Sequence, residues 1–480
     1  MAWPVASRRA REFKPIRRAQ AGYLGAAMRA VLFGGGTARE RLTHLLARRG
    51  ETVANYQPGV GVVGTLNASR WYNALGTDIA LVLPGVAANY ASAPDSPAIS
   101  ITGNLIVVVD ARMQDWTPTT QSPMVSKRSG TAGSRSFITK INPSGTLELT
   151  WSADGTAETS VASTALPPLV DGARYLLGYA FDVDNDAVGS DATFWYSTDS
   201  GATWTKIGAT VTTAGVTAIF DSDAILEIGT RDTGTVAGNA GVSIYRVQMY
   251  SGSNGTLASG INGTLAFDAD FSTHAKDTTS FAESANAATV TINSTAIAVP
   301  ARIGDATDLC QSIAASQPTI NADGTLTFDG TADYMKTAAF TLNQPETVYL
   351  VGKQVTWTGY EYILDGDTTA SIALFQTTAT PQICWFAGTE IATGALALNT
   401  KAIITGVING ASSSITINSS APTTGNAGSN NAGGFTVARQ GGAAAYGNIE
   451  VDEIIIRKTA DSAALQAQII ALENAIHGVF

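Results

Sequence analysis

The chain has 480 residues, 45% of them hydrophobic, which is enough for two or three domains with full cores. Only 14% of the residues are charged, against about 25% in an average soluble domain, while Gly, Ala, Thr and Ser are plentiful. This profile is typical of large β-sandwich proteins and disfavours a cytosolic enzyme. The sequence has no apolar run of 18 residues, so it predicts no membrane span.

The charge is divided between a basic beginning and an acidic remainder. Eleven Lys or Arg residues and three Glu residues give residues 1–51 a charge of +8. The whole chain has a net charge of −10, so −18 is left for the rest. A basic arm on an acidic body predicts that the arm docks on a partner. Aromatic residues are sparse in this arm, so nucleic acid is disfavoured as that partner.

Two short helices are predicted in the arm, at 20–33 and at 37–49. In the second, Thr37 and Glu40 form a capping box, and Leu42, Leu45 and Leu46 form an apolar stripe. Such short helices are marginal alone, so each apolar face must lie on another chain or on the body. The residues expected to dock are Leu42, Leu45, Leu46, Arg8, Arg9, Arg17 and Arg18. Paired arginines also occur in export signals, but Arg29 interrupts the following segment, so export is not expected.

From about residue 56 the sequence pattern predicts strands. Residues 98–110 form an apolar run, and GTLELTW at 145–151 alternates apolar and polar residues before a turn. Asp182, Asp184 and Asp186 alternate as in a calcium loop, although Ala187 and Thr193 stand where an EF-hand has Gly and Glu. A polar turn is the competing interpretation, so calcium is possible and no other cofactor is expected.

The segment STDSGATW at 197–204 has the Asp-box pattern. It predicts a β-hairpin in which Ser197 and Asp199 bond the turn and Trp204 packs beneath. In sialidases this element is structural and remote from catalysis, so one copy says nothing about sugar cleavage.

A hairpin is predicted again in the second half. Two Asp-Gly turns flank residues 325–328, where Leu326 and Phe328 share one face, and the apolar run at 346–353 follows as a strand. Near the end, residues 447–457 predict a last strand, and Leu465, Ile469, Leu472 and Ile476 share one face of a closing helix.

The order GTLTFDG, DYM and PETVYLV between 324 and 351 resembles the concanavalin A-like lectin/glucanase modules, the laminin-G-like jelly rolls, in the version found in bacteriophage virion proteins. The strands from 106 to 156 and those that end in GVSIYRVQMY at 241–250 resemble them again. The resemblance implies a mainly β chain with two tandem antiparallel jelly rolls. We predict a basic helical docking arm at 1–55, a first jelly roll with an insert or linker at 56–297, and a second at 298–480 with a C-terminal helix.

Glu450 and Asp452 occupy the first two places of the E-x-D-x-x-E strand of the endoglucanases in that superfamily. The third place is Ile455. Without an acid to protonate the leaving oxygen the mechanism fails, so we expect no catalytic residues and no enzyme.

The remaining candidates are few. Trp357, Tyr360 and Trp385 could stack on a glycan, although a buried core position is the commoner fate of such residues. The three histidines, His44, His274 and His477, are scattered and predict no zinc or Ser-His-Asp site. Cys310 and Cys384 are expected to be buried free thiols, because no disulfide framework is present.

The resemblance implies a non-enzymatic phage structural protein located in the virion as a tail fibre, spike, collar or head decoration. Its arm, residues 1–51, would bind other virion proteins, and its sandwiches would bind a host-surface glycan. We expect a homo-oligomer with no membrane contact. A polysaccharide depolymerase and a secreted bacterial adhesin are the alternatives.

Overall fold

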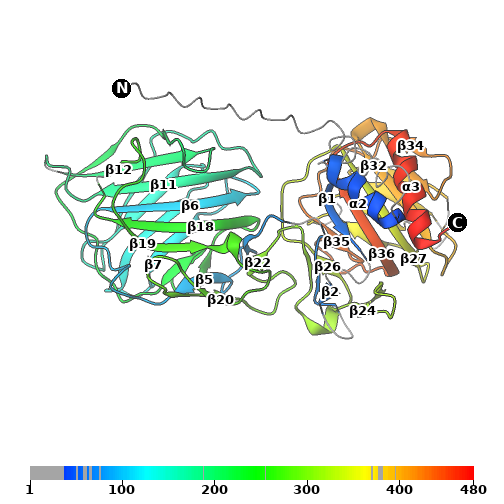
Figure 1. The fold of residues 1–480 in the computed structure, drawn as a ribbon, viewed down its shortest axis with the longest axis horizontal. Coiled ribbons are helices and arrows are strands. Elements are labelled where there is room, and N and C mark those ends of the chain that lie inside the picture. The colour runs from blue at the N-terminus through cyan, green and yellow to red at the C-terminus, as the bar shows by residue number, and fades with distance from the viewer. Residues whose placement is uncertain are drawn as a thin grey trace, which may run out of the picture.

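The structure is a computed structural model that describes residues 37–49, 52–57, 62–63, 68–74, 77–187, 189–253, 256–368, 371–376, 382–394 and 396–480. Figure 1 shows two β-sandwiches side by side, with two helices on the second one. The central strands pair antiparallel. The predicted fold class, mainly β with tandem sandwiches and a C-terminal helix, is therefore confirmed. The expected helix at 20–33 and Arg8, Arg9, Arg17 and Arg18 lie outside the described residues.

The first sandwich has two sheets. In order across the first sheet, the strands are β10 (Thr159–Ala162), β9 (Leu147–Trp151), β8 (Arg135–Ile141), β7 (Ser122–Arg128), β15 (Leu226–Ile228), β5 (Tyr90–Ala93), β21 (Thr289–Asn293) and β20 (Ser280–Ala282). The second sheet runs β13 (Thr205–Lys206), β12 (Gly189–Ser197), β11 (Arg174–Asp182), β6 (Leu105–Met113), β18 (Val242–Ser251), β4 (Ala80–Leu83) and β22 (Arg302–Gly304), with β14 (Val211–Ala214) on β12 and β19 (Thr264–Asp270) on β18. A small hairpin joins β16 (Thr230–Arg231) and β17 (Val236–Ala237).

Alternation along each strand builds the core between these sheets. Val107 and Val109 of β6 point inward and meet Met124 and Phe137 of the opposite sheet. Successive side chains of a strand point to opposite faces, so the intervening Ile106 and Val108 lie on the outer face, in a smaller cluster.

The second sandwich also has two sheets. One contains β24 (Thr319–Ile320), β25 (Leu326–Asp329), β36 (Asn448–Arg457), β27 (Glu346–Gln354), β32 (Ala402–Ile408), β33 (Ser413–Ile417) and β34 (Thr423–Gly425), with β1 (Thr52–Tyr56) on β36. The other contains β2 (Val62–Val63), β3 (Arg70–Trp71), β23 (Leu309–Cys310), β26 (Met335–Lys336), β35 (Thr436–Val437), β28 (Glu361–Asp365), β29 (Ala373–Gln376), β30 (Ile383–Phe386) and β31 (Glu390–Ala392). Three short 3-10 helices lie at Phe271–Thr273, Ala314–Ser316 and Gly410–Ser412.

Helices α2 (Ala38–Arg49) and α3 (Ala463–His477) lie together on the outer face of β27, β32 and β36 (Figure 1). Val348 and Leu350 of β27 face the core between the sheets, while Tyr349 and Val351 face the helices. Burial on both faces explains why this strand is a continuous apolar run. Neither helix has the length and apolar content to cross a membrane, as far as the chain is described.

The capping box predicted at the start of α2 is confirmed. The Thr37 amide donates to Glu40 Oε2 at 2.8 Å, and the Glu40 amide donates to Thr37 Oγ1 at 3.2 Å. Leu42 is 0% exposed and Leu46 2% exposed, and Leu45 packs against the same cluster. The sequence left open whether this apolar face packs on another chain or on the body of the protein. In the structure it packs on the second sandwich. These leucines are therefore not free to dock on a partner.

Strand pairing crosses the predicted domain border in both directions. The strands β1 and β3 precede the first sandwich but pair with β36 and β23 of the second. Conversely, β22 lies beyond residue 297 yet pairs with β4 of the first. Strands of two to five residues carry too little pattern to indicate which sheet they join. The segment 252–299 supplies β19, β20 and β21 to the first sandwich and so completes it.

Candidate functional site

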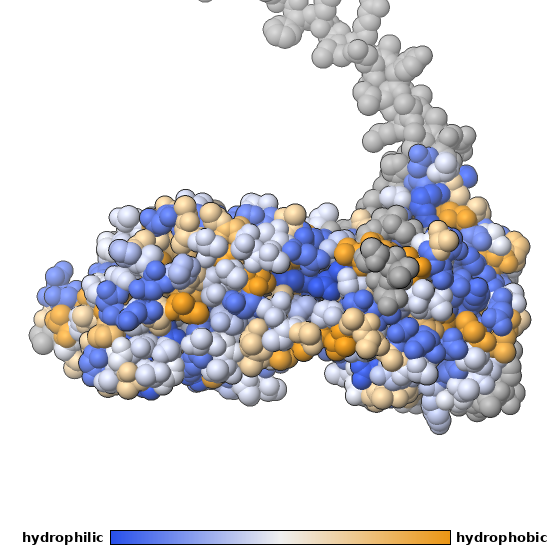
Figure 2. All heavy atoms as spheres, turned by 90° about the horizontal axis from the view of Figure 1, so that it is seen from below, coloured by the Kyte–Doolittle hydropathy of each residue, from blue (hydrophilic) through white to orange (hydrophobic). Residues whose placement is uncertain are grey.

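The two sandwiches meet at a groove formed by two pockets of about 350 and 560 Å³, which share Gln114, Thr341 and Leu342. We name this surface the inter-sandwich groove. Figure 2 shows two lobes joined at a waist, with hydrophilic side chains gathered near it. Across the groove, Thr341 Oγ1 donates to the Gln114 carbonyl at 3.1 Å. This bond ties the loop after β26 to the end of β6.

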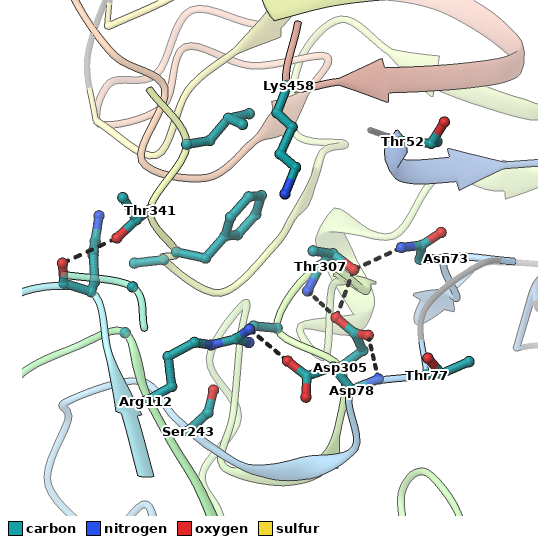
Figure 3. Close-up of a pocket in the computed structure, with 17 residues that line it drawn as sticks. Thr52, Asn73, Thr77, Asp78, Arg112, Ser243, Asp305, Thr307, Thr341 and Lys458 are labelled. Carbon is teal, nitrogen blue, oxygen red and sulfur yellow. Dashed lines mark hydrogen bonds and ion pairs between the residues drawn. The ribbon is translucent and has the colours of Figure 1, made fainter. Parts of the chain in front are cut away.

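An ion pair from the first sandwich forms one wall. Arg112, near the end of β6, contacts Asp78 Oδ2 through Nη1 at 2.5 Å (Figure 3). The Tyr245 hydroxyl donates to the same carboxylate oxygen at 2.8 Å. Burial raises the pKa of Tyr245, so its hydroxyl remains a donor. Asp78 is therefore held by two donors.

The loop between β22 and β23 forms the floor. Asp305 Oδ1 accepts from the Thr307 amide at 2.9 Å and from Thr307 Oγ1 at 2.7 Å. Asp305 Oδ2 accepts from the Asp78 amide at 3.2 Å, and Asn73 Nδ2 donates to Thr307 Oγ1 at 2.9 Å. Asp305 thus shapes the loop (Figure 3) and, like Asp78, is already engaged.

The opposite wall belongs to the second sandwich and carries the cationic side chain of Lys458. Lys458 follows β36 and extends its ammonium group into the cavity (Figure 3). Among the described residues, no hydrogen bond or ion pair engages this ammonium group. Phe340 also lines the groove, with its ring tilted against Phe435 at 5.8 Å between centroids. The groove therefore combines the ammonium group of Lys458 with one aromatic edge.

The carboxylates of β36 are paired with cations. Glu450 Oε2 lies 3.0 Å from Lys353 Nζ, and Asp452 contacts Lys401 Nζ. Ile455, which replaces the third acid, is fully buried under the helices. The expected lack of catalytic residues stays a prediction, but this strand face offers no unpaired acid and base couple among the residues described.

The structure places the three aromatic glycan candidates apart from the groove. Trp385 is 0% exposed and packs beneath Gly406, where an added Cβ would lie 1.2 Å from Trp385 Nε1. The sequence interpretation is wrong at Trp385, because a ring with no exposed face cannot stack on a sugar. Trp357 is half-buried against the core, whereas Tyr360 is 62% exposed and lies parallel to Phe375 at 6.5 Å.

Asp182, Asp184 and Asp186 build a turn. The Asp184 amide donates to Asp182 Oδ1, and the Asp186 amide donates to Asp184 Oδ1, each at 3.2 Å. Their carboxylates do not converge into a ligand group within the described part of the chain. Calcium binding stays a prediction.

The Asp-box hairpin is confirmed. Asp199 accepts from the Thr203 amide at 2.9 Å and from Thr203 Oγ1 at 2.6 Å, and Ser197 Oγ donates to Asp199 at 2.7 Å. The Thr203 and Ser197 bonds lower the pKa of Asp199 to about 2. Trp204 packs on the outer cluster of the sheet, as predicted. Cys310 and Cys384 are buried, and no disulfide joins them, as predicted.

Two features of the structure were not predicted from the sequence. The groove unites Arg112 with Lys458, residues far apart in the chain, so no local motif could indicate it. His477 lies beside Glu453 and Glu473, although the sequence predicted no cluster around a histidine. The only local signal was the spacing of Glu473 and His477, one helical turn apart.

No family model matches the chain, and no curated protein matches it. Among solved structures, domains LG4-5 of the mouse laminin alpha1 chain share 11% identity and a TM-score of 0.32, over 84% of this chain and 91% of that one. A putative carbohydrate binding protein from Bacteroides ovatus shares 12% identity and a TM-score of 0.30, over 44% and 58%. The Trypanosoma rangeli sialidase in complex with sialic acid shares 12% identity and a TM-score of 0.28, over 71% and 68%. Similarities this low assign the chain neither a family nor an activity.

Proposed function

We propose that this chain is a non-enzymatic structural protein of a bacteriophage virion that binds a host-surface glycan in the inter-sandwich groove. The observation that carries the glycan part is the polar, open groove between Lys458 on one wall and Arg112 on the other. No described residue pairs with the ammonium group of Lys458. The virion part rests on the sequence resemblance alone.

The chemistry of the groove suits a hydroxyl-rich ligand. Sugar hydroxyls both donate and accept, and the groove offers the ammonium group of Lys458, hydroxyl side chains such as Thr52 and Thr77, and the amide of Gln114. Phe340, which is 9% exposed, adds a small apolar edge to the groove. The volumes of about 350 and 560 Å³ fall in the range of about 300–1,000 Å³ typical of ligand sites.

The carboxylates that line the groove do not favour sugar cleavage. Glycoside hydrolysis needs one carboxylic acid that donates a proton and one carboxylate that attacks or activates water. Asp78 is held by Arg112 and Tyr245, and Asp305 by Thr307 and the Asp78 amide. Three further aspartates line the second pocket: Asp115 accepts from the Thr117 amide, Asp171 accepts from the Trp116 amide, and Asp367 pairs with Lys336. Since each carboxylate of the groove is already engaged by a described residue, a depolymerase is the less favoured alternative.

The test is a binding measurement on the full chain. Surface polysaccharides of candidate hosts are first screened on an array, and the affinity of a hit is then measured by calorimetry. Lys458→Met removes a charged donor that no described residue engages, and a hydrogen bond from a charged donor to a sugar hydroxyl contributes about 1.5–3 kcal/mol. We therefore expect binding about 10- to 100-fold weaker than for the wild type.

The matched control is Lys206→Met. Lys206 lies on β13 of the first sandwich, away from the groove, so its replacement should leave the affinity unchanged. Equal affinity of the Lys458→Met variant and the wild type would contradict groove binding. Release of new reducing ends by the wild type would instead support the depolymerase, and detection of the chain in secreted material without particles would support the adhesin.

A further inference from the structure

A buried polar cluster lies between α3 and β36, remote from the groove. It brings together Glu453 of β36 with Glu473 and His477 of α3, and one ligand atom from each lies within 4.8 Å of the others. His477 Nε2 is 2.9 Å from Glu453 Oε2 and 3.2 Å from Glu473 Oε2. Three groups that commonly bind metals thus converge on one point.

Local structure explains this convergence. Glu473 and His477 are four residues apart on α3, so they share one face of the helix. On β36 the register against β27 shifts by one residue between Val451 and Glu453, which is a bulge at Asp452. The bulge leaves both Asp452 and Glu453 on the side of the helices.

Glu473 is unusual because it is 0% exposed and neither of its oxygens has a hydrogen-bond partner among the described residues; only the contact with His477 is close. The side chain of His477 is only 5% exposed. A buried carboxylate without donors is costly unless a cation is nearby. This unsatisfied carboxylate, directed into the cluster, suits a cation as the ligand of the site.

The surrounding charges support the same conclusion. Arg39 of α2 pairs with Glu453 at 2.6 Å, and Lys401 pairs with Asp452. The three carboxylates of Asp452, Glu453 and Glu473 thus outnumber these two cationic side chains, so an ion bound at the cluster would lie among acidic groups.

We propose that Glu453, Glu473 and His477 bind a divalent transition-metal ion of the zinc type. Imidazole nitrogen together with carboxylate oxygen is a common ligand set for Zn²⁺, with bonds of about 2.0–2.2 Å. Ligand atoms around such an ion lie about 3–3.4 Å apart, close to the 2.9 and 3.2 Å separations here. Asp452 Oδ1 lies 3.6 Å from His477 Nδ1 and would orient the ring.

The ion would join parts of the chain that are far apart in sequence. It would link α3 to β36 directly and, through the Arg39 contact with Glu453, also hold α2. The side chain of Arg39 is 28% exposed, so its outward movement opens a path to the site. The site would stabilise the helical cover of the second sandwich.

The experiment uses the full, untagged chain, because a polyhistidine tag binds zinc. The protein is treated with a chelator, dialysed and titrated with Zn²⁺ in a calorimeter, with Mn²⁺ and Mg²⁺ as parallel probes. We expect saturable binding of one Zn²⁺ per chain and little response to Mg²⁺. An excess of about 100 times Kd should raise Tm by several degrees.

The variants Glu473→Gln and His477→Gln should each weaken Zn²⁺ binding at least tenfold. The matched control is Glu450→Gln on the same strand, which lies outside the cluster and should bind Zn²⁺ as the wild type does. Unchanged affinity in both cluster variants would overturn the proposal, because the ion would then bind elsewhere.

Circular dichroism checks that each variant is folded. If a variant does not fold, the wild type is titrated with Co²⁺ instead. The visible absorption of bound Co²⁺ reports whether nitrogen and oxygen ligands surround the ion. A saturable change at one Co²⁺ per chain, removed by competing Zn²⁺, supports the site. No saturable binding of Zn²⁺ or Co²⁺ to the wild type overturns the proposal.

Discussion

Glu346, the first residue of β27, carries a carboxyl group that is buried in the second sandwich. Its side chain is 0% exposed, and neither oxygen accepts a hydrogen bond from the described residues. Burial raises the pKa of this carboxyl group from 4.5 to about 8, because the charged form loses its hydration. The folded protein therefore keeps a proton that the unfolded chain releases.

The sign of the pH dependence follows from that difference. Below pH 4.5 both states hold the proton, and the contribution of Glu346 to the free energy of unfolding is complete. As the pH rises through the window from 4.5 to about 8, the unfolded chain loses the proton first and stability falls. The loss is about 1.4 kcal/mol per pH unit inside the window, or roughly 2.5 kcal/mol between pH 5 and pH 7.

Glu346→Gln removes this titration while it preserves the size and shape of the side chain. Urea unfolding of both proteins, followed by tryptophan fluorescence at several pH values, gives the difference in the free energy of unfolding. We expect this difference to shift by about 2.5 kcal/mol in favour of the variant from pH 5 to pH 7. The exposed Glu390 of β31 supplies the control, since Glu390→Gln should show no such shift. Parallel stability curves for the wild type and Glu346→Gln would refute the assignment of a neutral, buried acid.

Three further predictions concern packing and the hairpin. Leu42→Ala should lower the free energy of unfolding by about 2–5 kcal/mol, because Leu42 is fully buried between α2 and the sheet; an unchanged thermal transition would mean that α2 does not pack there. Gly406→Ala should destabilise by about 1–3 kcal/mol or more, because the added Cβ would overlap Trp385, and urea unfolding of wild-type stability would contradict that packing. Asp199→Asn should speed amide hydrogen exchange at Thr203, which donates to Asp199, and unaltered protection would show that the bond does not hold the turn.

Local patterns predicted the elements well. The alternation at 325–328 gave β25 with Leu326 and Phe328 fully buried. The Asp-box and the capping box of α2 formed as predicted. These features depend on contacts within a few residues, which the sequence displays directly.

Long-range packing was beyond the same reasoning. The apolar stripe of Leu42, Leu45 and Leu46 on α2 could pack on the protein's own sheet or on a partner. It packs on its own sheet because the outer face of β27 is apolar, a contact between segments far apart in the sequence. Trp385 is buried because Gly406 leaves room for its ring, a contact between strands that no local pattern encodes. The groove arises where β6 and the end of β36 come together, so Arg112 and Lys458 could not be paired in advance.

The central claim is that a glycan binds between the two sandwiches. The most direct measurement is a crystal structure of the full chain with an oligosaccharide taken from the polysaccharide that it binds. We predict sugar density in the inter-sandwich groove, with hydroxyl groups within hydrogen-bond distance of Lys458 and Arg112. Density beside the exposed ring of Tyr360, with no sugar in the groove, would contradict the account.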